Sequence, residues 1–185
     1  MSMRVRLLFC LLIVCCLSGY SQSTSTHATV TDAGQFPAVQ AVSLSGTRFD
    51  LPQNLGGQVN LVVISFAREQ QQAVDSWLPA ARQIETSHNQ FRYYELPTMA
   101  RQNILYRWWF NAALRSNTTD QDLRNRILPM YVNKHKFLRS LRIRNDKNVV
   151  AVLIDQSGRV LWRADGPYTE QKEQALVSAL PKGPY

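Results

Sequence analysis

One stretch of the chain, residues 59–78, constrains the fold more than any other. Its first eight residues are almost wholly apolar and rich in β-branched side chains, which is typical of a strand buried on both faces of a sheet. Beyond a short polar loop, apolar residues recur at helical spacing: Ala73, Val74, Trp77 and Leu78. A buried strand that feeds a helix begins a parallel crossover, so this stretch predicts an α/β fold.

The first 21 residues have the parts of a secretory signal peptide. Arg4 and Arg6 precede an eleven-residue apolar core, and Gly19 and Ser21 are small residues placed for cleavage after Ser21. The apolar core is shorter than the roughly 20 residues that span a bilayer. We therefore predict an exported, periplasmic or other extracytoplasmic protein. A retained membrane anchor, a lipidated Cys15 or Cys16 and a mitochondrial presequence are the alternatives.

The three cysteines, Cys10, Cys15 and Cys16, all lie inside this segment. Cleavage after Ser21 leaves a mature chain without any thiol, and therefore without a disulfide or a thiolate metal ligand. Residues 22–35 are rich in Ser, Thr and Ala, and we expect a flexible tether there. The whole chain has 45% apolar and 18% charged residues, which suits one globular domain, and we place it over residues 36–181.

The order of predicted elements in this domain is regular at both ends. A hairpin over residues 36–51 precedes the central strand, and Pro79 should kink the following helix or begin a new turn. A strand over residues 91–96 ends at Pro97. The last part predicts a strand at 149–154, a turn at 155–158, a returning strand at 159–164 and a helix at 170–180.

Residues 97–147 form an insert between the second and third core strands. Helical spacing is clear over residues 103–115, where Arg107, Asn111 and Arg115 belong to one narrow polar stripe and apolar residues cover the rest. Asp120 can cap a second helix that continues through Leu128 and Tyr131, although Pro129 should disturb it.

The insert carries the charge of the molecule. Between residues 101 and 147 there are eleven Lys or Arg and three Asp, a net +8 that equals the formal charge of the whole chain. Bases interleaved with aromatic residues favour an anionic membrane surface or a partner protein, and export disfavours nucleic acid. The candidate contact residues are Arg107, Trp108, Trp109, Lys134, Lys136, Phe137, Arg139, Arg142 and Arg144. The alternative is that the aromatic residues pack on the sheet while the bases face water.

The element order resembles that of the thioredoxin-like superfamily, over about residues 36–180. The nearest likeness is to the thioredoxin-like ATP synthase assembly factors of mitochondria, carried by Ser65-Phe66, by residues 72–77 and by Gly158-Arg159-Val160-Leu161-Trp162. The resemblance implies a central mixed sheet flanked by helices, with the insert as a helical addition. It also implies a role in assembling a membrane subunit rather than in catalysis.

The residues of thioredoxin chemistry are absent. Gln70, Gln71 and Gln72 occupy the start of the first helix, where such proteins carry a thiolate, and Val149 stands where the resemblance implies a proline. His27, His88 and His135 are scattered, and Glu69 and Asp75 have no accompanying nucleophile. We therefore predict no catalytic residue, no metal site and no cofactor.

These observations predict a non-catalytic binding or assembly factor for a membrane-associated protein. A thiol-dependent oxidoreductase or peroxiredoxin-like enzyme requires one of the leader cysteines to be retained near the domain. An inert scaffold domain is the third possibility.

Overall fold

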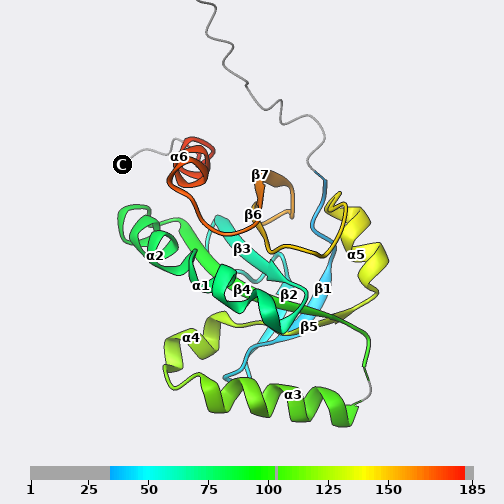
Figure 1. Cartoon of the computed structure of the whole chain (residues 1–185). Coiled ribbons are helices and arrows are strands. Elements are labelled where there is room, and N and C mark those ends of the chain that lie inside the picture. The colour runs from blue at the N-terminus through cyan, green and yellow to red at the C-terminus, as the bar shows by residue number, and fades with distance from the viewer. Residues whose placement is uncertain (1–33, 103, 182–185) are drawn as a thin grey trace, which may run out of the picture.

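A mixed five-stranded sheet forms the centre of the domain (Figure 1). The computed structural model describes residues 34–102 and 104–181, so the predicted signal peptide, most of the predicted tether and Asn103 lie outside the described residues. The strand order is β5-β4-β3-β6-β7. The strands are β3 (Val59–Ser65), β4 (Phe91–Ala100), β5 (Met130–Val132), β6 (Val150–Asp155) and β7 (Val160–Asp165). β3 and β5 run parallel to β4, whereas β6 runs antiparallel to β3 and β7.

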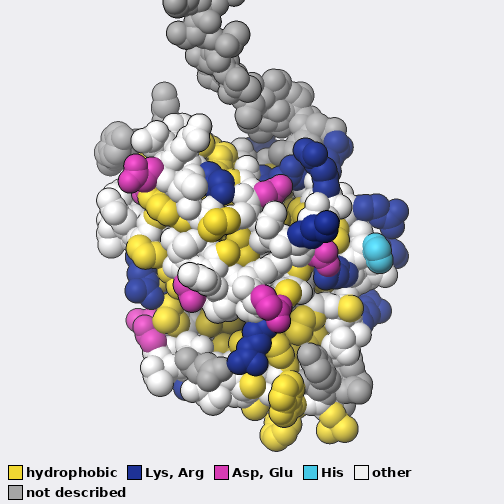
Figure 2. All heavy atoms as spheres, in the orientation of Figure 1, with side chains coloured by type: hydrophobic (Ala, Val, Ile, Leu, Met, Phe, Trp, Pro, Cys, Tyr) yellow, Lys and Arg dark blue, Asp and Glu magenta, His cyan; other side chains and the backbone are white. Residues whose placement is uncertain are grey.

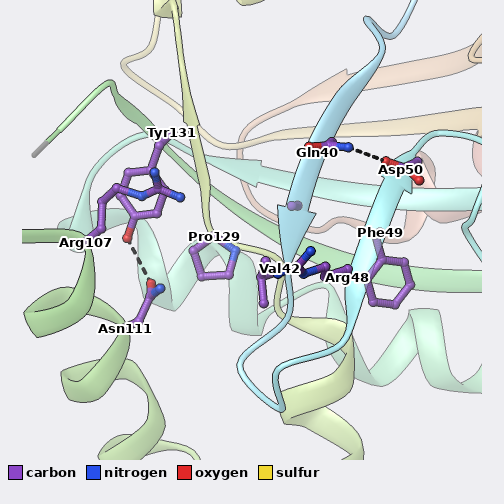
Figure 3. A pocket seen from close by; sticks show the side chains of 10 residues that line it. Gln40, Val42, Arg48, Phe49, Asp50, Arg107, Asn111, Pro129 and Tyr131 are labelled. Carbon is purple, nitrogen blue, oxygen red and sulfur yellow. Dashed lines mark hydrogen bonds between the residues drawn. The ribbon is translucent and has the colours of Figure 1, made fainter. Parts of the chain in front are cut away.

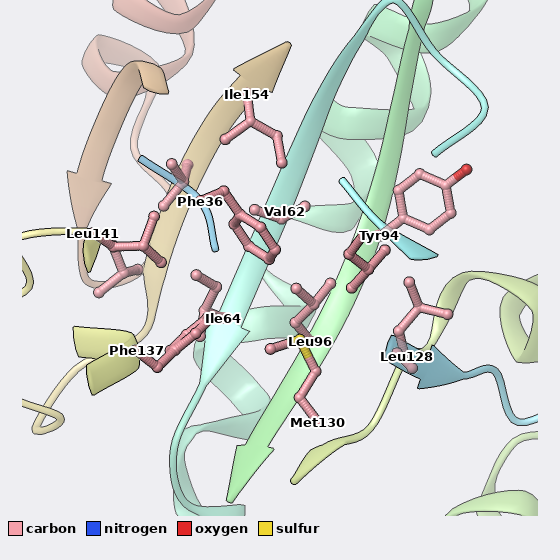
Figure 4. Close-up of a cluster of buried hydrophobic side chains, with 14 of the residues drawn as sticks. Phe36, Val62, Ile64, Tyr94, Leu96, Leu128, Met130, Phe137, Leu141 and Ile154 are labelled. Atoms are coloured by element: carbon pink, nitrogen blue, oxygen red, sulfur yellow. The ribbon is translucent and has the colours of Figure 1, made fainter. Parts of the chain in front are cut away.

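The central strand is β3, as its apolar sequence predicts, and all seven of its residues are buried. Val62 lies between Tyr94 of β4 and Val152 of β6. Because successive side chains of a strand point to opposite faces, β3 supplies both sides of the core. Val62 and Ile64 belong to one buried cluster (Figure 4), and Leu61 and Val63 belong to the other.

Different helices cover the two faces of the sheet. The short helix η2 (Arg68–Gln70) leads into α1 (Gln71–Asp75), and α2 (Leu78–Ser87) and α6 (Glu170–Ser178) complete one face. The other face packs against α5 (Lys134–Ser140) and an antiparallel hairpin of β1 (Val39–Val42) and β2 (Arg48–Leu51). This layout confirms the predicted thioredoxin-like α/β architecture with helices on both sides of a mixed sheet.

Pro79 separates two helices. α1 ends at Asp75, and α2 begins at Leu78 with Pro79 in its first turn. A proline is tolerated there because the first amides of a helix have no partner within that helix. The predicted new turn at this proline is confirmed.

Two boundaries inside the insert differ from the sequence prediction. β4 does not end at Pro97 but continues to Ala100, where its last residues pair with β5. The predicted second helix is α4 (Gln121–Arg126), which ends before Leu128 and is followed by β5. Pro129 cannot supply a helical amide, and pairing with β4 stabilises the extended backbone instead. The insert is therefore not wholly helical, because it also adds an edge strand to the sheet.

The longest helix of the insert is α3 (Ile104–Asn117), which lies across the lower end of the domain in Figure 1. It matches the predicted helical segment within two residues. Among the described residues no helix is long and apolar enough to cross a bilayer.

Candidate functional site

A recess opens at the carboxyl ends of β3 and β4. Ligands of open α/β sheets bind at this edge, because the loops that leave parallel strands diverge there. The recess has a volume of about 380 Å³. It is lined by residues 65–68 and Gln71, by residues 97–99 of β4, and by Trp109, Phe110, Ala113 and Leu114 of α3. The loop in the redox position and the insert, which the sequence treats as separate candidates, thus share one cavity, here called the α3 recess.

The orientation of α3 is inverted relative to that of an ordinary surface helix. Its polar stripe faces the domain, where Asn111 Oδ1 accepts a hydrogen bond from the Tyr131 hydroxyl at 2.9 Å and Arg115 Nε donates to the Leu44 carbonyl at 2.8 Å. Large apolar side chains point to solvent instead: Leu105 is 75% exposed, Trp108 70% and Trp109 59%. These three residues are here called the apolar ridge. Figure 2 shows hydrophobic side chains at the lower edge of the molecule, the end at which α3 lies in Figure 1.

Two hydrogen bonds of the Gln70 side chain hold the loop after β3 in place. Gln70 Oε1 accepts a hydrogen bond from the amide of Phe66 at 2.8 Å, and Gln70 Nε2 donates to the carbonyl of Asp146 at 2.9 Å. Gln71 lines the α3 recess, and Gln72 is exposed. At the predicted vacant redox position, Gln70 therefore connects two loops of the domain.

The loop is held on its other side by Lys134. The Lys134 ammonium forms an ion pair with the Asp146 carboxylate and lies 5.5 Å from the centre of the Phe66 ring. The hydrogen bond from Lys134 holds the pKa of Asp146 below its ordinary value. Lys134 is thus engaged inside the domain, and it contributes little free charge to a contact surface.

A buried carboxyl group that sequence reasoning did not single out lies beneath α1. Glu95 of β4 is 5% exposed, and burial raises the pKa of its carboxyl to about 7. The nearby Asp75 carboxylate also raises this pKa, while a hydrogen bond from Gln71 lowers it. The alternation of side chains along β4 could have indicated that Glu95 is buried, since it shares a face with the buried residues Phe91 and Tyr93. Asp75 thus faces Glu95, and the sequence gives no reason to expect that pair.

The structure distributes the predicted contact residues over two regions. Trp108 and Trp109 lie on α3, whereas Lys136, Arg139, Arg142 and Arg144 are exposed on α5 and in the segment after it. Figure 2 shows Lys and Arg side chains gathered on the side of the molecule where α5 lies. Arg107 stacks on the Tyr131 ring at 4.5 Å. Phe137 is 2% exposed and belongs to the core, so the prediction that it lies on a contact surface is wrong. Its side chain packs edge-on against Phe36.

The described part of the chain lacks thiols and clusters of metal-ligating side chains. Residues 34–102 and 104–181 contain no cysteine and no group of three or more His, Cys, Asp or Glu placed to hold a metal ion. His88 ends α2 and His135 lies on α5, so the structure does not bring these two histidines into a cluster.

A model of a known protein family matches the chain over the whole domain. The family model described as ATP10 protein matches residues 27–182. The chain belongs to the ATP10 protein family. This match confirms the resemblance to assembly factors that the sequence suggests. No curated protein sequence matches the chain.

Solved structures with the same fold are distant in sequence. BsSco, a member of the Sco family of cytochrome c oxidase assembly proteins, is 14% identical with a TM-score of 0.54, and the match covers 80% of this chain and 94% of that one. A proposed electron transport protein of Aquifex aeolicus VF5 is 14% identical with a TM-score of 0.57, over 80% and 95% of the two chains. The thioredoxin domain of a thiol-disulfide oxidoreductase from Bacteroides vulgatus is 14% identical with a TM-score of 0.52, over 79% and 95%. At this identity they show the fold alone.

Proposed function

We propose that this member of the ATP10 protein family is a non-catalytic assembly factor that binds a membrane-associated protein through the apolar ridge of α3. The observation that carries the proposal is the inverted orientation of α3. Its polar stripe is used inside the domain while Leu105, Trp108 and Trp109 face solvent. Exposing three large apolar side chains on one helix is costly in water, so a contiguous patch of this kind supports a binding role.

The α3 recess extends this surface toward the sheet. Trp109 belongs both to the apolar ridge and to the lining of the recess. A hydrophobic segment of a partner that lies along the ridge therefore also meets Phe110 and Leu114. An apolar helical segment of a partner can bind in this way, by laying its apolar face into a hydrophobic groove.

The residues at the redox edge support a non-catalytic role. Thiol exchange needs a thiolate, and positions 17–185 carry no cysteine. Gln70 uses both ends of its amide to join the loop to Asp146, so this position is committed to structure. We infer an extracytoplasmic location, in which the leader is removed and the domain works next to a membrane.

The exposed cations around α5 suit the membrane itself. Lys136, Arg139 and Arg144 are exposed. Each basic residue near an anionic bilayer contributes about 1 kcal/mol of attraction. In this proposal α5 approaches the lipid headgroups, while α3 holds the protein that is being assembled. Flotation with anionic vesicles tests the lipid contact: wild type should float, and the combined variant Arg139→Glu, Arg142→Glu, Arg144→Glu should stay at the bottom of the gradient.

The protein contact is tested by photo-crosslinking in cells. A photoreactive amino acid at position 108 should capture an integral membrane protein that mass spectrometry identifies. The matched control is position 177, because Val177 is an exposed apolar residue (40%) on α6, away from the apolar ridge. Loss of the crosslinked product in a Leu105→Ser background would tie the capture to the ridge. The same product from positions 108 and 177, or none from position 108, would refute the proposal.

A further inference from the structure

We propose that a groove between β1 and β5 binds an extended, acidic segment of a partner protein as an additional strand. The proposal goes beyond the assembly function argued above, because it concerns the opposite side of α3 and a different chemistry. It rests on the arrangement of two strand edges and on the charges around them.

Two adjoining recesses make up the groove. One has a volume of about 540 Å³ and lies between the β1–β2 hairpin, α3 and the start of β5 (Figure 3). The other, of about 520 Å³, continues along β1 toward α5. Gln40 of β1 and Tyr131 of β5 line both recesses, so the two form one continuous β1–β5 groove.

The groove separates two strand edges that run antiparallel. The Leu44 amide donates to the Ile127 carbonyl at 3.1 Å, which fixes one end. From there the lining proceeds in opposite directions, through residues 42, 40 and 38 on one wall and residues 129, 131 and 133 on the other. No backbone hydrogen bond joins residues 37–42 to residues 129–133, and β1 and β5 belong to different sheets. Within residues 34–102 and 104–181 the outward backbone groups of β1 have no hydrogen-bond partner, so this edge is open to an added strand. The β5 wall offers fewer such groups, because Pro129 has no N–H and the Asn133 carbonyl already accepts a hydrogen bond from the Phe137 amide.

The dimensions suit one short strand. Residues 37–42 of the β1 wall extend for about 20 Å, at roughly 3.3 Å per residue. A partner segment of about six residues fills this length and pairs its backbone with β1, as in other complexes formed by strand addition. The added strand would extend the two-stranded hairpin into the groove, beside the β5 wall.

The positive charges that line the groove favour an acidic partner segment. Arg48, Arg101, Arg107 and Lys136 line the groove and are exposed. Within residues 34–102 and 104–181 none of these four forms an ion pair. The Arg107 guanidinium is held over the Tyr131 ring, which fixes its position in the wall. The lining carboxylate, Asp50, already accepts a hydrogen bond from Gln40 at 2.9 Å. Carboxylates on the added strand would pair with these cations.

The apolar residues that line the groove indicate which uncharged residues the bound segment carries. Val42, Pro129 and Val132 supply the floor beside the cations. Successive side chains of a strand point to opposite faces. A segment that alternates acidic and aliphatic residues therefore meets both the cations and the apolar lining of the groove. The segment of this chain that precedes Gly34 fits less well, because residues 22–33 contain one acidic residue, Asp32.

Binding of synthetic peptides to the purified protein tests the proposal. The probe is a fluorescent pool of eight-residue peptides that alternate Glu with Val, Ile or Leu. One control pool carries Lys in place of Glu, and another has N-methyl groups on alternate amides, so it cannot pair as a strand. We expect the acidic pool to bind, both control pools to fail, and backbone amide NMR shifts to concentrate in β1 and β5.

Matched charge reversals separate the groove from general attraction. Arg48→Glu with Arg107→Glu should weaken binding of the acidic pool about tenfold or more. Arg139→Glu with Arg144→Glu, the same change in charge near α5, should alter it less than about twofold. Equal losses in the two variants, or no binding by the acidic pool, would overturn the proposal. Binding that requires removal of residues 22–33 would assign the groove to the chain's own segment instead.

Discussion

The helices α3 and α5 belong to the same insert and mix the same kinds of residue, yet they face the domain in opposite ways. α5 buries its large apolar residue, Phe137, and exposes Lys136 and Arg139. α3 directs Asn111 and Arg115 toward the domain and exposes Leu105 and Trp108. The comparison shows that a basic, aromatic composition does not by itself define a contact surface.

The difference arises from how the apolar residues are distributed around each helix. In α5 Phe137 lies four residues before Leu141, and both are buried in one core cluster, which leaves the cations outside. In α3 apolar residues occupy most of the circumference, so one side must remain exposed whichever side is buried. Contacts to Tyr131 and to the Leu44 carbonyl determine which side that is.

The largest expected effect contrasts the buried Phe137 of α5 with the exposed Trp108 of α3. Phe137→Ala removes a ring from the core and should lower the free energy of unfolding by about 3–5 kcal/mol. Leu105→Ser with Trp108→Ser removes exposed groups and should change it by less than about 1 kcal/mol. Denaturant unfolding measures both. A large loss of stability in the α3 variant would mean that the ridge is part of the core of the domain.

A second prediction contrasts a buried carboxyl group, that of Glu95, with an exposed one, that of Glu69. The pKa of Glu95 is about 7 in the folded chain and 4.5 ordinarily, so the folded state binds more protons between these values. Stability should therefore fall as the pH rises through this window. Glu95→Gln removes that loss and should be more stable than wild type by up to about 3 kcal/mol near pH 8.5. Near pH 4.5 the two should unfold alike.

Unfolding curves at several pH values, compared with those of Glu69→Gln, measure this effect. Glu69 is an exposed carboxylate on the neighbouring loop, and its variant should stay within about 0.5 kcal/mol of wild type. An unchanged pH profile in Glu95→Gln would show that Glu95 is ionised without cost.

The smallest effect is expected at Gln70, whose side chain links the loop after β3 to the loop that contains Asp146. Gln70→Ala leaves the amide of Phe66 without its acceptor and should cost about 1–2 kcal/mol. Hydrogen exchange at that amide should accelerate, because the loop loses its link to Asp146. Gln72→Ala, at an exposed position two residues later, is the control. Equal exchange rates in the two variants would contradict the role of Gln70 in closing the loop.

The strands and most helices could be predicted from the sequence. The run at residues 149–154 is wholly apolar, and the run at 59–66 is interrupted only by Asn60 and Ser65, so a strand covered on both faces accommodates them. The edge strand β5 escaped prediction because its three residues follow Pro129 within a helix-like spacing, and only pairing with β4 makes them extended. The sequence predicts that Gln70 occupies the redox position, whereas its hydrogen bond to the Asp146 carbonyl depends on a loop 76 residues away.

The sequence by itself determined the buried strands, the order of the elements outside the insert and the absence of thiols from the domain, since burial on two faces and residue identity are local properties. The tertiary structure alone decided which side of α3 faces the domain, that Phe137 lies inside, and that β1 and β5 face each other across a groove. Periodicity places residues relative to one another around a helix or along a strand. The partner on which an element packs is set by contacts between segments far apart in the chain.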